Sequence, residues 1–261
     1  MYLIPLLVTL GVFVALWPIS LRLRDASVVD IWWGPGFGAQ IVLAAWWSGN
    51  ALGPREWMLV ALVCLWSLRL GWVLTARRAR AGSEDPRYTV LRDAWHPGFW
   101  WKSLFVVFLL QGILQWLIAL GPMAGVLAGQ NNIGVVAAIG AAIAAAGLGL
   151  EALADRQLDK FKRTAEPGAL FTGGLRAHLR HPNYLGEVVF WIGVGLIVAE
   201  GGLWIAALWS PLLITVLLTR LSGVPMLDER LSATRPGYAA YRRAVPGFIP
   251  RFRAWRQRRA A

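Results

Sequence analysis

Charge is scarce in this sequence. Only 15% of its 261 residues are Asp, Glu, Lys or Arg, whereas soluble domains carry about a quarter. Between the charged segments lie apolar runs of about 20 residues, the length that crosses a bilayer as a helix. Because these runs are long and recur along the whole chain, they favour a membrane protein over a soluble protein with unusually buried helices.

Cysteine and the common catalytic motifs are nearly absent. Cys64 is the single cysteine, which excludes a disulfide within the chain and a metal site of the Cys-x-x-Cys type. There is no His-Glu-x-x-His, Gly-x-Ser-x-Gly or phosphate-loop motif, so we expect neither a metal site nor a serine nucleophile. The N-terminal apolar run lacks a basic flank and a small-residue cleavage site, and we interpret it as a retained helix.

Seven apolar segments are long enough to span a membrane. We place them at 2–20, 27–48, 55–76, 100–121, 132–154, 184–199 and 201–221. Small residues crowd the fifth segment, which lets a neighbouring helix approach closely. The sequence therefore predicts one all-α domain, 1–261, a polytopic membrane helical bundle. Two long cytoplasmic connections and the C-terminal tail are expected to form a polar cap.

The net charge of +12 is distributed unevenly. Nearly all of the 26 Lys and Arg residues precede residue 27 or lie in 77–102, 155–183 and 220–261. Basic connections stay in the cytoplasm, so the pattern predicts an external N-terminus and a cytoplasmic C-terminus, with 120–134 as an external turn. No nucleic-acid-binding module accompanies the charge, and we expect contact with membrane lipids and none with nucleic acid.

The segment 151–164, EALADRQLDKFKRT, follows the fifth span. If it is helical, Glu151, Asp155, Asp159 and Lys162 share one broad face. Carboxylates near the membrane and cations toward water suit a ligand with a hydroxyl-bearing sugar and phosphates. The alternative is a solvated helix face at the membrane surface.

The segment 175–187, LRAHLRHPNYLGE, leads into the sixth span. Asn183 and Glu187 are four residues apart and project from one helix face. Arg176 and Arg180 are also four apart, and their guanidinium groups could grip phosphate in forked geometry. The alternative is helix capping and interface anchoring, although a carboxylate one turn inside an apolar helix needs a donor.

Aromatic and basic residues alternate after the seventh span. Glu229 follows that span directly, and Tyr238, Tyr241, Arg242 and Arg243 lie on a short amphipathic segment. A flat ring and two guanidinium groups could cover an adenine and its ribose phosphate. A plain membrane-surface helix is the alternative.

Asp30 stands at the start of the second span, in SVVDIWWGPGFGAQ. We expect a lone carboxyl group among indole rings to hold its proton near neutral pH and to act as a proton donor. The alternative pairs Asp30 structurally with Arg69. The glycines and Pro35 that follow are expected to break or kink the helix and open space beside a neighbour.

These clusters, in this order, resemble the steroid 5α-reductase-like membrane family. The similar blocks are SVVDIWWGPGF, GSEDPRYTVLR, GLRAHLRHPNYLGE, GVPMLDERL and RPGYAAYRRAVPGFIP. The RHPNYLGE block is similar to a superfamily that also contains sterol reductases and isoprenylcysteine carboxyl methyltransferases. The VVDIWWG and EDPRY blocks resemble its bacterial branch, a domain of unknown function.

The resemblance implies a monomeric enzyme of the bacterial inner membrane that binds NADPH in a cavity facing the cytoplasm. It would transfer a hydride to the C=C bond of a lipophilic enone, similar to a 3-oxo-Δ4-steroid, that enters from the bilayer. Residues 1–121 would hold the substrate and 122–261 the cofactor.

Site residues follow from the resemblance by matching position. Asp30 falls where the family holds a ketone-binding glutamate, Trp66 where it has a tyrosine, and Arg69 would position the acid. Cofactor contacts are implied at Asp155, Lys162, Arg176, Asn183, Tyr184, Glu187, Glu229, Tyr241, Arg242, Arg78 and Arg80.

Two other functions stay open from the sequence. A methyltransferase that binds S-adenosylmethionine would need a similar pocket, although the many cations suit a cofactor that carries phosphates. A non-catalytic transporter or lipid-binding protein would need polar groups leading to both sides, and the external half is nearly uncharged.

Overall fold

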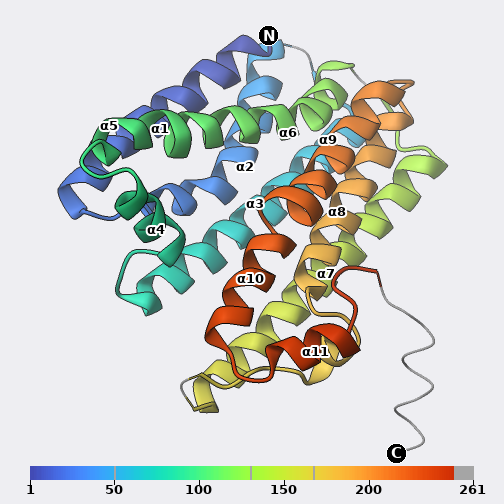
Figure 1. Cartoon of the computed structure of the whole chain (residues 1–261). Helices are drawn as coiled ribbons and strands as arrows, with labels where there is room; N and C mark the ends of the chain where they lie inside the picture. The colour runs from blue at the N-terminus through green and yellow to red at the C-terminus, as the bar shows by residue number, and fades with distance from the viewer. Residues whose placement is uncertain (50, 130, 167, 250–261) are drawn as a thin grey trace, which may run out of the picture. The chain divides into compact units, whose positions relative to one another are not determined.

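The computed structural model describes residues 1–49, 51–129, 131–166 and 168–249, and every regular element within them is a helix (Figure 1). Seven stretches are long and apolar enough to cross a membrane. They are α1 (Leu3–Leu23), α2 (Val28–Ser48), α3 (Pro54–Ala81), Phe99–Leu127, α7 (Val135–Thr164), α8 (Pro182–Ala199) and Trp204–Thr234. The chain is therefore an all-α, multi-pass membrane protein, as the apolar runs predicted.

Two of the seven stretches contain several helical segments. Phe99–Leu127 consists of α5 (Phe99–Ser103), a π-helical segment η1 (Leu104–Leu109) and α6 (Leu110–Leu127). Trp204–Thr234 consists of α9 (Trp204–Val216), a π-helical segment η3 (Leu217–Leu221) and α10 (Val224–Thr234). Shorter elements are α4 (Pro86–Ala94), a 3₁₀ turn η2 (Gly174–Ala177) and α11 (Tyr238–Ala244).

Most differences from the predicted spans lie at their ends. The helix α3 continues to Ala81, where Gly82 ends it with φ of 67°, and α7 continues to Thr164. Hydropathy marks where a helix leaves the apolar core, but backbone hydrogen bonds can continue into the polar region. The basic and acidic residues of 151–164 are therefore helical, as that interpretation required.

The predicted external turn over 120–134 is wrong for its first half. The helix α6 continues through Pro122 to Leu127. Proline has no N–H, which frees the carbonyl of the residue four positions earlier. Here the hydroxyl of Ser210 donates to the Ile118 carbonyl oxygen at 2.5 Å, so a neighbouring helix supplies the missing donor.

The predicted break of the second span is also wrong, because α2 continues through Pro35 to Ser48. Its glycines bring neighbours close instead of opening space. A Cβ at Gly34 would lie 2.9 Å from the carbonyl oxygen of Ser67, and one at Gly38 would lie 2.9 Å from the Ser67 hydroxyl. That hydroxyl donates to the Gly34 carbonyl at 2.6 Å and accepts from the Gly38 N–H at 2.9 Å.

The chain forms two compact units, each described here by itself. Unit 1 contains Met1–Ala138 and Val194–Ser210, and unit 2 contains Ile139–Gly193 and Pro211–Ala261. The division of the chain at residue 121 into substrate and cofactor halves concerns ligands and stays a prediction.

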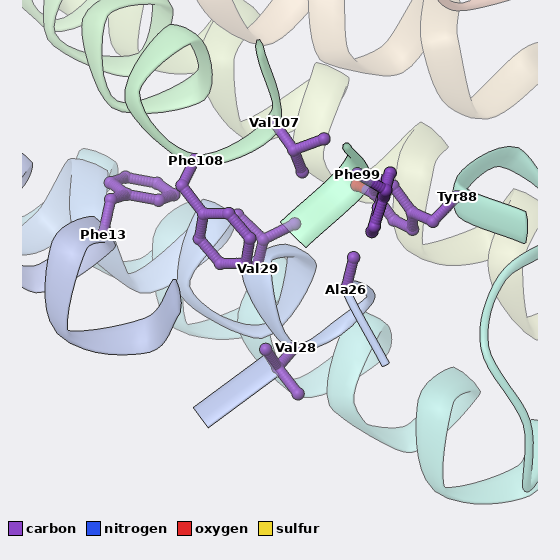
Figure 2. Packing of buried hydrophobic residues seen from close by; sticks show 8 residues of the cluster. All are labelled: Phe13, Ala26, Val28, Val29, Tyr88, Phe99, Val107 and Phe108. Carbon is purple, nitrogen blue, oxygen red and sulfur yellow. The ribbon is translucent and has the colours of Figure 1, made fainter. Parts of the chain in front are cut away.

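Unit 1 has an apolar cluster at the start of α2. Figure 2 shows its buried members, which come from α1, α2, α4, α5, η1 and the residue before α2: Phe13, Ala26, Val28, Val29, Tyr88, Phe99, Val107 and Phe108. Tyr88 is the single member whose side chain carries a polar group. The cluster therefore fixes the ring of Tyr88 and leaves its hydroxyl to find a partner.

Unit 2 is built on the pair α7 and α8, which run side by side (Figure 1). A Cβ at Gly186 would lie 2.7 Å from both the Gly147 carbonyl oxygen and the Glu151 backbone nitrogen. The two backbones are thus in direct contact, as the small residues of the fifth span predicted. The contact sets Glu151 on α7 beside the start of α8.

Candidate functional site

Asp30 lies in the first turn of α2, and both of its carboxylate oxygens have partners. The Tyr88 hydroxyl donates to Oδ1 at 2.7 Å, and Arg87 Nη2 lies 2.7 Å from Oδ2. Gln111 Nε2 donates to the Tyr88 hydroxyl oxygen at 3.1 Å. We call these four residues the Asp30 cluster. The prediction of a lone carboxylate is therefore wrong, because α4 brings a cation and a phenol to it.

The connection before α4 holds this arrangement in place. Asp85 caps α4 by accepting from the Arg87 backbone N–H at 2.9 Å. The Asp85 N–H in turn donates to the Ser27 hydroxyl at 2.6 Å, and the Ala26 N–H donates to Glu84 Oε1 at 2.7 Å. The EDPRY block is thus hydrogen-bonded to the residues that begin α2.

The environment of the Asp30 cluster keeps the phenol protonated and the guanidinium charged. Burial and then the negative charge of Asp30 raise the pKa of Tyr88 well above its usual range. Burial lowers the pKa of Arg87, but the charges of Asp30 and Asp85 outweigh it and raise that pKa overall. The cluster therefore offers fixed hydrogen-bond donors at neutral pH.

The other two predicted catalytic residues lie on α3 in unit 1. Trp66 is fully buried, and its ring packs edge-to-face on Phe37 with centroids 5.3 Å apart. It is a core side chain of the α2–α3 contact. Arg69 is partly buried one turn further along α3. The ion pair of Asp30 is with Arg87, which the alternative pairing with Arg69 did not foresee.

Two predicted cofactor contacts, Arg78 and Arg80, also lie in unit 1. Arg78 forms an ion pair with the buried carboxylate of Asp25. Arg80 is exposed, and its Nε donates to the Ala76 carbonyl of its own helix at 3.0 Å. The charge of Arg78 is therefore already balanced inside unit 1.

The other predicted cofactor residues all lie in unit 2, on α7, η2, α8, α10 and α11. Asp155, Glu187 and Tyr241 are buried. Arg176, Asn183 and Tyr184 are partly buried, and Lys162, Glu229 and Arg242 are exposed. The Tyr241 hydroxyl donates to the Arg176 carbonyl at 2.5 Å, which connects α11 to η2.

A second polar cluster in unit 2 surrounds Asp228 on α10. Its carboxylate accepts from Arg180 Nη2 at 2.6 Å, lies 2.8 Å from His181 Nε2 and accepts from the Tyr238 hydroxyl. Arg180 Nη1 also donates to the Val245 carbonyl at 2.6 Å. We call Asp228, Arg180, His181 and Tyr238 the Asp228 cluster. The interpretation that Arg180 grips phosphate together with Arg176 is wrong, because Arg180 is committed to Asp228.

Burial also sets the protonation states in this second cluster. Burial lowers the pKa of His181 and outweighs the hydrogen bond to Asp228, so the ring is neutral at pH 7. Burial and Asp228 raise the pKa of Tyr238 above its usual range. The cluster is an internal connection among η2, α8, α10 and α11. Nothing in the spacing of its residues along the sequence signals it.

Two buried polar atoms of unit 2 have no hydrogen-bond partner among the described residues. They are Asn183 Oδ1 and His181 Nδ1, at the start of α8. Native proteins satisfy nearly all buried polar atoms, so each such atom is a candidate for contact with a ligand. Asn183 was predicted as a cofactor contact, and His181 was not.

Two apolar pockets lie in unit 1, and neither is lined by a predicted site residue. One of about 220 Å³ lies between α2 and α3 beside Pro35 and Cys64. The other, of about 680 Å³, is lined by Tyr2, Leu120 and Trp209 among others. Within the described residues, no group of three or more His, Cys, Asp or Glu side chains is placed to hold a metal ion.

A family model described as a protein of unknown function, DUF1295, matches residues 16–245. No curated protein and no solved structure matches the chain. The matched range includes both the Asp30 cluster and the Asp228 cluster.

Proposed function

The chain belongs to the DUF1295 family, and we propose that it is an NADPH-dependent membrane reductase related to the steroid 5α-reductases. Its substrate is a lipophilic enone, similar to a 3-oxo-Δ4-steroid, whose C=C bond is reduced. One observation carries the proposal. The VVDIWWG and EDPRY blocks, far apart in the sequence, meet through the side chains of Asp30, Arg87 and Tyr88.

The Asp30 cluster has the chemistry that such a reduction needs from the protein. Reduction of an enone places negative charge on the carbonyl oxygen, and donors fixed around that oxygen lower the barrier. The phenol and the guanidinium are such donors, and the apolar cluster of Figure 2 limits water around the phenol.

Unit 2 fits the cofactor. NADPH, when bound, supplies the hydride, while the proton comes from water. Asn183 Oδ1 and His181 Nδ1 are buried atoms that a carboxamide group such as that of nicotinamide would satisfy. Lys162 and Arg242 are exposed cations suited to phosphate, and Asp155 and Glu187 are carboxylates suited to ribose hydroxyls.

The charge pattern supports a location and an orientation. We place the protein in the bacterial inner membrane as a monomer, with its N-terminus outside and its C-terminus in the cytoplasm. The substrate enters from the bilayer. This orientation puts the basic segments in the compartment that contains NADPH.

Ligand-dependent thermal stability tests the proposal. A ligand that binds only the folded state raises its stability, by about 2.7 kcal/mol at a hundredfold excess over Kd. Purified protein in detergent should gain more from NADPH than from NADH or S-adenosylmethionine. Asn183→Ala should lose most of the gain, whereas the matched control Thr234→Ala, at an exposed position of unit 2, should keep it. Equal melting temperatures with and without NADPH would contradict the proposal.

A methyltransferase of the isoprenylcysteine carboxyl methyltransferase type is the second candidate, and one observation favours it. Arg78 and Arg180 are balanced by Asp25 and Asp228, which leaves fewer cations for phosphate than the sequence suggested. S-adenosylmethionine has no phosphate and would need fewer. Stabilisation by S-adenosylmethionine alone would reverse the order of the two candidates.

A further inference from the structure

The proposed reduction needs a group that donates a hydrogen bond to the carbonyl oxygen of the substrate. Trp66, at the position of the family tyrosine, is packed inside the α2–α3 contact. Asp30 forms an ion pair with Arg87, and an ion-paired carboxylate has no proton to donate. The structure therefore requires a different donor from the two that the sequence suggested.

We infer that Tyr88 is the catalytic hydrogen-bond donor to the carbonyl oxygen, and that the substrate is an uncharged carbonyl compound. The inference rests on the proposed function and extends it to a residue and a substrate class.

The geometry of the Tyr88 hydroxyl is the first support. It donates to Asp30 at 2.7 Å and accepts from Gln111 at 3.1 Å, so its proton is directed and its oxygen is stabilised by a neighbouring N–H. The ring is fixed in the apolar cluster with Phe99 and Val107 (Figure 2). A donor whose position is fixed before the reaction needs little reorganisation in the transition state.

Access to this group is the second support. The Asp30 side chain keeps 22% of its surface exposed and that of Arg87 keeps 44%, so the cluster opens on the side of the carboxylate. A carbonyl oxygen that reaches Asp30 can take the phenol proton as its hydrogen bond, while Asp30 keeps its ion pair with Arg87. The Arg87 guanidinium carbon also lies 5.3 Å from the centre of the Tyr88 ring, where its charge favours electron density on the phenol oxygen.

The charge of the cluster selects the substrate class. Arg87 is balanced by Asp30 and also lies 3.1 Å from Asp85 through its Nε, so two carboxylates face one guanidinium. A carboxylate or phosphate on the substrate would be repelled there, because the guanidinium charge is already compensated. An uncharged ketone needs only a hydrogen-bond donor.

Infrared spectroscopy of a bound ketone tests the inference without turnover. The probe is testosterone labelled with ¹³C at its C3 carbonyl, added to the full-length protein in detergent. A hydrogen bond to the carbonyl lowers its stretching frequency. Wild type should show a bound band below that of free testosterone, and Tyr88→Phe should return the band to the free position and weaken binding about five- to tenfold. Tyr2→Phe, at the exposed N-terminus, should match wild type.

A second measurement does not depend on the Phe variant folding. Replacing the five tyrosines by 3-fluorotyrosine makes each phenol a stronger donor, and the bound band should move further down. An unchanged band and affinity in Tyr88→Phe, or no bound band in wild type, would overturn the inference. Absence of stabilisation by NADPH, with a Tyr88-dependent band, would instead overturn the reductase and leave Tyr88 as a carbonyl-binding residue.

Discussion

Asp228 is one carboxylate held by three buried side chains, and its loss should be costly. The side chains of Arg180 and Asp228 are only 9% and 4% exposed, so removing the carboxylate leaves a buried guanidinium without its counter-ion. Breaking such a pair typically costs about 3–5 kcal/mol. We expect Asp228→Ala to lower unfolding stability by that order in a thermal or denaturant titration in detergent.

Glu229 is the matched control for this prediction. It is the next residue of α10 and is exposed, so Glu229→Ala should change stability by less than about 0.5 kcal/mol. Equal losses in the two variants would mean that the Asp228 cluster contributes nothing specific to the stability of unit 2.

At the residue scale, the sequence identified where polar chemistry lies but not which residues are partners. Asp30 and the EDPRY block both stood out, yet nothing in the sequence placed Arg87 and Tyr88 on the carboxylate. Partner choice depends on how α4 folds back on the start of α2, which involves contacts between residues far apart in the chain. The Asp228 cluster was missed for the same reason, since Arg180 and Asp228 are paired across 48 residues.

The pair α7 and α8 depends on glycines whose replacement has a calculable consequence. A methyl group at Gly186 would lie 2.7 Å from backbone atoms of Gly147 and Glu151, and backbone cannot move aside as a side chain can. The helices would have to separate, and overpacking of this kind costs about 1–3 kcal/mol. Gly186→Ala should therefore lower the melting temperature and weaken any NADPH-dependent stabilisation.

Gly149 on α7 provides the control for the helix pair. A Cβ there meets no other atom within 4 Å, so the substitution tests glycine removal without a steric clash. Gly149→Ala should leave stability unchanged or raise it by up to about 1 kcal/mol, because alanine is the better helix former. A Gly186→Ala protein as stable as Gly149→Ala would show that the close approach of α7 and α8 is not required.

At the element scale, the sequence predicted the spans well because hydropathy and length suffice for a helix in lipid. It failed at prolines and glycines. Pro122 and Pro35 were expected to end or break helices, but both helices continue. In α6 the hydroxyl of Ser210 satisfies the freed carbonyl. A one-dimensional pattern shows the missing N–H of proline but not the neighbouring helix that compensates for it.

At the scale of the whole molecule, one consequence follows from the distribution of charge. The reductase requires its polar segments on the side of the membrane that contains NADPH, and the positive-inside rule puts the basic connections on that same side. The connection that contains Ser83 should therefore be cytoplasmic, and the one that contains Ala51, after α2, should be external. The sequence provides this orientation through charge alone, while the division into two compact units, with Val194–Ser210 in the first, has no counterpart in its hydropathy.

Thiol labelling tests that orientation directly, because Cys64 is the single native cysteine. In a Cys64→Ser background, Ala51→Cys and Ser83→Cys each place one thiol at an exposed position. In spheroplasts, a membrane-impermeant maleimide should label Ala51→Cys at once and Ser83→Cys only after the membrane is permeabilised. The Cys64→Ser protein should remain unlabelled throughout. Labelling of Ser83→Cys in intact spheroplasts would put the EDPRY block outside, away from NADPH, and would rule out the reductase as well as the orientation.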